Sequence, residues 1–376
     1  MPILSWLSVR ATRLIRPAGV ALLLLLAWPA LAEDVRIASW NIQHLGWQND
    51  KDYNALGRIG GAFDVIAVQE VMNLEGLDGF VAALERETGE TWERIYSHRI
   101  GRGRYKEKYA FVYRPSRVHY LDGAVVYLDQ HDNFARQPFA ARFQTADGAH
   151  RFVLATVHIL YGNRISDRTP EIKYLARYWD WLHEVFDQDS NFILLGDFNL
   201  RPSHNAWAPF HGRARSLIND GATTISTIEG RFANLYDLIW IDRDSTLPIR
   251  STGILAFPEV LGLSHERSRD IVSDHVPVYA VVETPGPFPP RQSGGVEPTW
   301  QDGRSAPSSP NTEARPRAPP DGTEPDGPGI RGNRNSQIYH LPECPSYDRV
   351  GKQNRVTFAS EEEAVRNGYR RAGNCP

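Results

Sequence analysis

Polar side chains that can bind a metal ion or a phosphate group stand at the ends of five apolar stretches of the sequence. The stretches are "SWNIQ", "VQEV", "TVHIL", "LLGDFN" and "SDHVPV", and the side chains are Asn41, Glu70, His158, Asp197, Asn199, Asp274 and His275. A single Asp or Asn after a strand is usually a turn residue. A whole set of carboxylates, amides and imidazoles without cysteine is typical of a site for a hard divalent cation such as Mg²⁺.

Two further acids stand in unusual places. Asp237 lies inside the apolar stretch "LYDLIWI", where a buried carboxylate needs a partner. Glu107 stands among Arg104, Lys106 and Lys108 directly before the apolar stretch "YAFVY". A solvated surface charge is the ordinary interpretation of Glu107, and a role in the site is the alternative.

A rigid sheet is needed to aim these side chains at one place. Seven apolar runs of strand length predict its strands: "VRIASW", "VIAVQ", "YAFVY", "RFVLATVH", "FILLGDF", "LYDLIWI" and "VPVYAVV". The clearest helical pattern runs from Pro170 to Phe186, with Thr169 as its expected N-cap. The number of short strands exceeds what one doubly wound sheet needs, so we expect an α/β fold of two packed sheets with outer helices.

The N-terminus carries a targeting signal. Arg10, Arg13 and Arg16 precede the apolar run "AGVALLLLLAWPALA", and small residues at 30 and 32 complete a Sec cleavage site. We expect residues 1–32 to be a signal peptide and the protein to be secreted or periplasmic. An uncleaved membrane anchor is the alternative, although the run is short for a span of about 20 residues.

The rest of the chain divides by composition. Residues 33–284 have a globular composition, and twelve of the 26 prolines fall between 285 and 328. We expect residues 285–331 to be a disordered linker and residues 332–376 to form a small separate module. Removing the three arginines of the signal from the net charge of −3 leaves −6. An acidic protein of this kind needs a local basic patch to bind a polyanion.

The motif series WN, QE, H, GDFN, YD and SDH, in this order over residues 34–283, resembles the endonuclease/exonuclease/phosphatase superfamily. The resemblance implies a four-layer α/β/β/α sandwich. Within that superfamily, "YKEKYAFVYRP" and "NFARQPF" resemble the corresponding segments of the deoxyribonuclease I-like branch.

The resemblance also implies roles for single residues. Glu70 would be the principal ligand of Mg²⁺, or of Mn²⁺ in its place, with Asn41 and Asp274 close to the ion. The catalytic group would comprise Asp197 and Asn199, which orient the water and hold the scissile phosphate, and the pairs His158–Glu107 and His275–Asp237. The substrate contacts would come from Arg136, Tyr105 and Arg104.

Two features depart from the resemblance. Met72 stands where the deoxyribonuclease I pattern has an arginine, so one contact to the DNA groove is missing. The loop before Arg136 is short, which disfavours a structural Ca²⁺ site near Asp129 and Asp132.

The predicted function is that of an exported, divalent-metal-dependent endonuclease acting on nucleic acid, duplex DNA in the first place, with little sequence specificity. A basic loop with Arg99, Arg102, Arg104, Lys106 and Lys108 would contact phosphates. One alternative is a phosphodiesterase or phosphatase acting on lipid or inositol phosphates, and another is a non-catalytic binding module on the same fold. No stable protein partner is evident, and no membrane contact is expected after signal cleavage.

The C-terminal module resembles the small zinc module of the Ada DNA-repair protein. Three possible ligands are present, His340, Cys344 and Cys375, and Ala372 occupies the fourth position. Because a closed zinc site needs four ligands, a Cys344–Cys375 disulfide is the favoured outcome and zinc the alternative.

Overall fold

The computed structural model describes residues 33–47, 50–103, 105–286, 288, 291 and most of 330–375. The predicted signal peptide, most of the predicted linker and Arg104 lie outside these residues. Among the helices within the described ranges, none has both the length and the apolar character that a membrane crossing requires.

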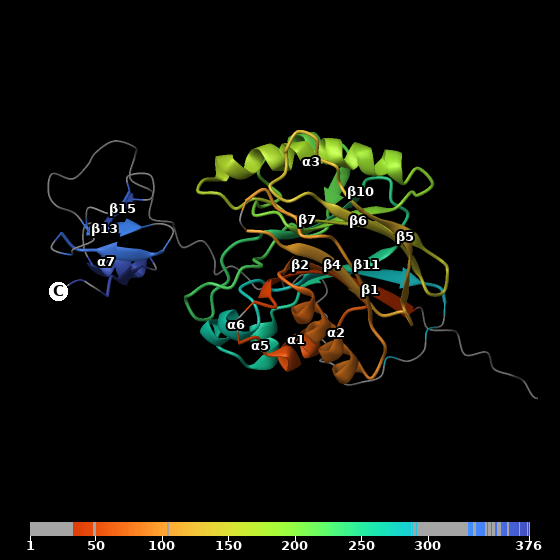
Figure 1. Cartoon of the computed structure of the whole chain (residues 1–376), viewed down its shortest axis with the longest axis horizontal. Coiled ribbons are helices and arrows are strands. Elements are labelled where there is room, and N and C mark those ends of the chain that lie inside the picture. The colour runs from red at the N-terminus through yellow and green to blue at the C-terminus, as the bar shows by residue number, and fades with distance from the viewer. Residues whose placement is uncertain are drawn as a thin grey trace, which may run out of the picture. The chain divides into compact units, whose positions relative to one another are not determined.

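Two six-stranded mixed sheets form the body of the part of the chain from residue 33 to 284 (Figure 1). In spatial order, the strands of the first sheet are β11 (Ile249–Ile254), β12 (Val278–Thr284), β1 (Glu33–Leu45), β2 (Val65–Val71), β4 (Lys108–Tyr113) and β3 (Glu93–Tyr96). Those of the second are β5 (Val118–Val126), β6 (Phe139–Thr145), β7 (Arg151–His158), β8 (Phe192–Asp197), β10 (Asp237–Asp242) and β9 (Ala214–Ser216).

Helices cover the outer face of each sheet, which confirms the predicted four-layer sandwich (Figure 1). The helices α1 (Tyr53–Gly60), α2 (Leu74–Thr88), α5 (Phe257–Leu261) and α6 (His265–Ile271) lie on the side of the first sheet. The second sheet is covered by α3 (Ile165–Val185), with the short η1 (Asn205–Trp207) and α4 (Ala208–His211) near it.

The central strands are buried on both faces because their side chains alternate between two cores. On β1, Ile37 belongs to the core shared with the second sheet, and Ala38 belongs to the core under α1 and α2. On β2, Val65 and Ile66 divide in the same way. Continuous apolar runs therefore predicted these strands correctly, whereas the edge strands β3, β5, β9 and β11 and the internal strand β6 were missed.

The start of α3 was predicted wrongly. The helix begins at Ile165, with Arg164 as its N-cap residue, so Thr169 lies inside it. Pro170 is the sixth residue of the helix and cannot donate to the Ser166 carbonyl, which accepts instead from the Thr169 hydroxyl at 3.1 Å. The side chain of Asp167 accepts hydrogen bonds from the backbone N–H groups of Asn163 and Arg164, and these contacts stabilise the first turn.

Strand register brings the polar strand ends together. β7 and β8 are parallel, with His158 opposite Asp197, and β10 runs antiparallel to β8 with Asp237 also opposite Asp197. Asn41 lies opposite Gln69 on the parallel pair β1 and β2 in the other sheet. Both sheets therefore present their site residues at one edge of the sandwich.

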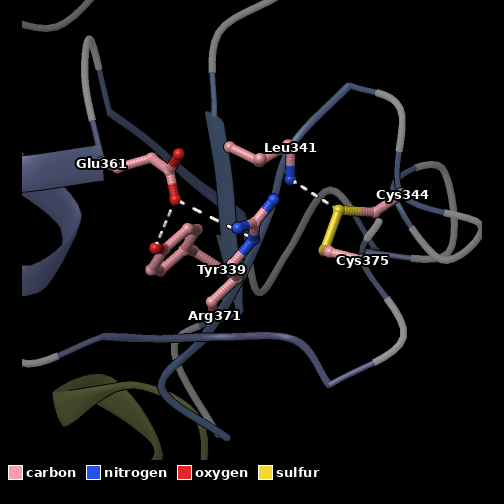
Figure 2. The surroundings of a disulfide bond; sticks show 6 residues. All are labelled: Tyr339, Leu341, Cys344, Glu361, Arg371 and Cys375. Atoms are coloured by element: carbon pink, nitrogen blue, oxygen red, sulfur yellow. Dashed lines mark hydrogen bonds and ion pairs between the residues drawn. A yellow bond between two sulfur atoms is a disulfide. The ribbon is translucent and has the colours of Figure 1, made fainter.

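The described residues of the C-terminal module form a four-stranded sheet and one helix. In spatial order, its strands are β15 (Arg355–Phe358), β13 (Ile330–Asn333), β14 (Ile338–His340) and β16 (Arg370–Arg371), and its helix is α7 (Glu361–Arg366). Figure 2 shows the Cys344–Cys375 disulfide, with the Leu341 backbone N–H donating to Cys344 Sγ at 3.0 Å. The structure thus contains the favoured disulfide, with His340 near both sulfur atoms.

Gly196 permits the close approach of β7 and β8 at the site. Its φ is +150°, and a Cβ atom there would lie 2.0 Å from the carbonyl oxygen of Val157. Gly196→Ala should therefore lower the free energy of unfolding by about 3 kcal/mol or more, because the backbone must shift. Urea unfolding followed by tryptophan fluorescence measures this loss. Gly212→Ala is the control, since no atom lies within 4 Å of its Cβ position; equal effects of the two changes would contradict the prediction.

Candidate active site

The carboxylate of Asp197 is the centre of the site. It is 1% exposed, and its Oδ2 accepts a hydrogen bond from Asn41 Nδ2 at 3.2 Å. The same oxygen lies 3.5 Å from His158 Nε2 and 3.7 Å from His275 Nε2. Two imidazoles and one amide thus converge on a single carboxylate oxygen, from β7, from the segment before β12 and from β1.

Each imidazole has its own carboxylate on the opposite side of the ring. His158 Nδ1 lies 3.1 Å from both carboxylate oxygens of Glu107, and His275 Nδ1 lies 2.7 Å from Asp237 Oδ2. The structure therefore brings together both pairs that the resemblance implied. A carboxylate on Nδ1 holds the imidazole in one orientation and leaves Nε2 to face the centre.

Charge in this buried cluster shifts the proton affinities. Burial and the Arg136 guanidinium act to lower the pKa of His158, but the Glu107 carboxylate raises it above the ordinary value. Burial likewise opposes protonation of His275, and the carboxylates of Asp237 and Asp197 raise the pKa of that histidine well above normal. Burial acts to raise the pKa of Asp197, but the two imidazoles hold it below the ordinary value. The cluster thus favours charged imidazoles beside an ionised carboxylate.

Glu70 occupies a bulge in β2. Its φ is +60°, and the pairing of β2 with β4 shifts register between Val68 and Val71. A bulge redirects a side chain and is common beside active sites. Glu70 Oε1 accepts from Asn41 Nδ2 at 3.2 Å, and Oε2 accepts from the His44 backbone N–H at 2.9 Å.

His158 and His275 line an open pocket, and residues with oxygen ligands suitable for a hard cation line it as well. The acidic residues Glu70, Asp197 and Asp274 are among the residues that line it. Asn41 lies next to the first two through its amide. This donor set fits Mg²⁺ or Mn²⁺. A second grouping, Asp197, Asp237 and His275, has its ligand atoms within 4.8 Å of one another, but His275 Nδ1 is already hydrogen bonded to Asp237 there.

Asn199 supports the centre through its backbone and its side chain. Its N–H donates to Asp197 Oδ1 at 2.9 Å, and its side-chain amide donates to the Ile159 carbonyl at 2.9 Å. Its φ is +52°, a left-handed conformation that asparagine tolerates better than most residues. Asn199 also lines the pocket, so a water-orienting role stays a prediction.

Two of the predicted substrate contacts, Arg136 and Tyr105, lie in different parts of the site. Arg136 lies behind Glu107, 3.7 Å from its Oε2, and its guanidinium donates to the carbonyls of His158 and Ile159. Contact of Arg136 with a phosphate stays a prediction. Tyr105 lies at the rim, where its hydroxyl is 3.9 Å from Met72 Sδ.

The basic loop and the acids of the Arg136 loop have local partners. Arg102 donates to the Asp132 carbonyl, and Lys108 donates to the Ser97 carbonyl. Asp129 accepts from the Asn133 side chain and the Phe134 backbone N–H. These contacts stabilise the loops around the site entrance, whereas Arg99 and Lys106 are exposed to solvent.

Several residues at the site were missed from the sequence. Lys51 is buried, donates to the Val272 carbonyl at 2.7 Å, and has a pKa lowered to about 8 by burial against the opposing attraction of Asp274 and Glu70. Tyr161 and Arg269 line the pocket. Lysine, tyrosine and arginine outside a motif carry no sequence signal for a site, so only the fold could identify them.

The Glu107–His158 pair predicts a pH-dependent stability. The raised pKa of His158 gives stability that is complete below about pH 6.5 and is lost as the pH rises through the raised value. The lowered pKa of Glu107, where burial is outweighed by His158 and Arg136, gives stability that is complete above about pH 4.3 and is lost as the pH falls through the lowered value.

Glu107→Gln should therefore lower the free energy of unfolding most at pH 5.5, by about 2 kcal/mol, and less at pH 9. Urea unfolding in EDTA at both pH values measures the difference. Glu75→Gln, which changes an exposed acid of α2, is the control. An equal loss at both pH values would show that the pair is not charged in the folded protein.

Comparison with known proteins agrees with this geometry. Residues 38–275 match the family described as "Endonuclease/Exonuclease/phosphatase family". Residues 308–371, in the C-terminal part, match the ArfC family. A "Deoxyribonuclease" of Thioalkalivibrio sp. (strain K90mix) is 49% identical over 278 residues, which cover 72% of this chain and 77% of the relative. Human "Deoxyribonuclease gamma" is 31% identical, with 69% of this chain and 89% of the relative covered.

Solved structures agree at the level of the fold. An endonuclease/exonuclease/phosphatase family protein from Bacteroides thetaiotaomicron superposes with a TM-score of 0.50 at 17% identity, covering 67% of this chain and 98% of that protein. The family match spans every catalytic-domain motif from Asn41 to His275. The chain therefore belongs to the endonuclease/exonuclease/phosphatase family, in its deoxyribonuclease I-like branch.

Proposed function

We propose that this protein is an exported, Mg²⁺-dependent endonuclease that hydrolyses phosphodiester bonds in DNA with little sequence specificity. The observation that carries the proposal is the convergence of two His–carboxylate pairs on Asp197, beside the carboxylates of Glu70 and Asp274. The deoxyribonuclease names of its relatives support DNA as the substrate.

Hydrolysis of a phosphodiester needs an attacking water, charge neutralisation on the phosphate and a proton for the leaving oxygen. Glu70, with Asn41 and Asp274, would hold the Mg²⁺ ion, which supplies Lewis acidity worth several kcal/mol when bound. The exposed side of the pocket between these groups and the two histidines is where the phosphate would bind.

The chain's own residues supply the proton transfers. The Nε2 atoms of His158 and His275 both face Asp197. An imidazole that is neutral during turnover can take a proton from water, while the other, in its charged form, gives its proton to the leaving oxygen. Glu107 and Asp237 hold the rings in place and stabilise their charged forms. Asp197, fixed by Asn41 and the Asn199 backbone, orients the water between them.

Plasmid nicking tests the proposal. The full chain should convert supercoiled plasmid to the open circle with Mg²⁺ and should fail to do so with EDTA. Glu70→Gln and Glu107→Gln should each lower the rate by about 10²-fold or more, because one removes a ligand and the other leaves His158 without its carboxylate. Gel electrophoresis of timed samples measures both rates.

Glu75→Gln, on the exposed surface of α2, should nick at the unchanged rate. Full activity of Glu70→Gln would refute the assigned site. The wild type could instead hydrolyse sphingomyelin or an inositol phosphate with Mg²⁺ and leave DNA intact. That result would refute DNA as the substrate and support metal-dependent hydrolysis of phosphoesters. Inactivity on every phosphoester would favour a binding module.

Export is tested separately. The proposed signal peptide predicts that the protein recovered from an exporting bacterial host begins at Glu33, because the Sec cleavage rule places the cut after Ala32. Intact-mass measurement of the protein from the periplasm or medium gives the N-terminus. Protein that keeps residues 1–32 in the membrane fraction would support the anchor instead.

A further inference from the structure

Trp47 is an exposed tryptophan at the rim of the active site. Its side chain is 45% exposed, although a tryptophan usually buries most of its apolar surface. The His44 ring stacks on it, with centroids 4.6 Å apart and an interplanar angle of 28°. The Tyr105 ring meets it edge-on at 5.8 Å. Trp47 is thus held by two other rings while part of its surface faces solvent.

Hydrogen bonds hold the backbone that leads into Trp47. Gly46 has a φ of +92°, and its carbonyl accepts from Asn73 Nδ2 at 2.5 Å, while Asn73 also caps the start of α2. The Leu45 carbonyl accepts from the Met72 backbone N–H at 2.9 Å. A Cβ atom on Gly46 would lie 2.2 Å from the Asn73 side chain, so the packing leaves no room for another residue. A fixed, exposed aromatic ring loses little conformational entropy when a ligand packs on it.

The exposed ring lies next to the proposed catalytic groups. His44, which stacks on Trp47, has Nε2 3.4 Å from Glu70 Oε2, and its backbone N–H donates to the same oxygen. A nucleotide whose phosphate is bound beside Glu70 would place its neighbouring base within reach of Trp47. Met72 is 3% exposed, lies 3.9 Å from the Tyr105 hydroxyl through its Sδ, and offers no charge for a groove phosphate.

This inference rests on the proposed function. We propose that Trp47, braced by His44, is a stacking platform for an unpaired nucleobase next to the scissile phosphate. An exposed indole face stacks on any base, so the contact is independent of sequence. Bases within a duplex are already stacked on their neighbours, and the platform therefore serves single-stranded or frayed DNA more than intact duplex.

The test compares single-stranded and duplex cleavage by the full chain. One short oligonucleotide is used alone and annealed to its complement, with Mg²⁺. Trp47→Ala should lower kcat/KM on the single strand by about 5- to 100-fold and on the duplex by no more than about 2-fold. Trp47→Phe should restore most of the single-strand activity, since phenylalanine keeps an aromatic face.

Tyr96→Ala is the matched control, because Tyr96 is an aromatic residue of similar exposure, 42%, on the edge strand β3. It should leave both activities unchanged. The preserved duplex activity of Trp47→Ala reports that the variant is folded. An equal loss on both substrates, or no loss on the single strand, would overturn the platform.

Failure of the proposed function gives a different result. If the wild type cleaves neither substrate, that function is wrong, and fluorescence anisotropy of the labelled single strand in EDTA then tests the platform without turnover. Weaker binding by Trp47→Ala than by Tyr96→Ala would support it, and equal binding by the two variants would exclude it.

Discussion

The site depends on the hydrogen bond between Asn41 and the buried carboxylate of Asp197, because this bond joins the two sheets. Asn41 reaches the carboxylate from β1 of the first sheet, while His158 approaches from the neighbouring strand of the second sheet. Beneath it, Gln69 on β2 donates to the Thr156 hydroxyl on β7 at 2.8 Å, a second polar contact between the sheets. Any sliding of one sheet over the other would break both contacts, so the packing of the sandwich fixes the geometry of catalysis.

A buried charge cluster of this kind is stable only when every group has a partner. The structure meets this condition with a carboxylate on each imidazole, and it accepts left-handed backbone at Glu70 and Asn199 to aim the remaining side chains. Such conformations cost of order 1–3 kcal/mol each. The apolar cores on both sides of β1 and β2 supply the stability that offsets this strain. Rigidity at the site is thus a consequence of burial in a four-layer fold.

Much of the fold could be predicted because most central strands are buried on both faces and therefore read as continuous apolar runs. The internal strand β6 was missed because the half-buried Arg142 and Gln144 interrupt its apolar residues. Edge strands such as β3 and β9 have one neighbour and mixed burial, so their sequences carry no comparable signal. The beginning of α3 was misjudged because Thr169–Pro170 has the form of a helix start. The true first turn is stabilised by Asp167, whose contacts with the loop before it depend on the tertiary path of the chain.

The sequence by itself determined which polar groups stand at strand ends, their order along the chain and hence the family. It determined the pairs of Glu107 and Asp237 with histidine only through resemblance, since the partners are 51 and 38 residues apart. The tertiary structure alone decided that Lys51 and the Trp47 loop lie at the site. No periodicity or motif marks these residues, because their positions depend on how the segment after β1 packs against α2 and the chain near Val272. Strand ends are local properties of a sequence, whereas a shared pocket is a property of the packed sheets.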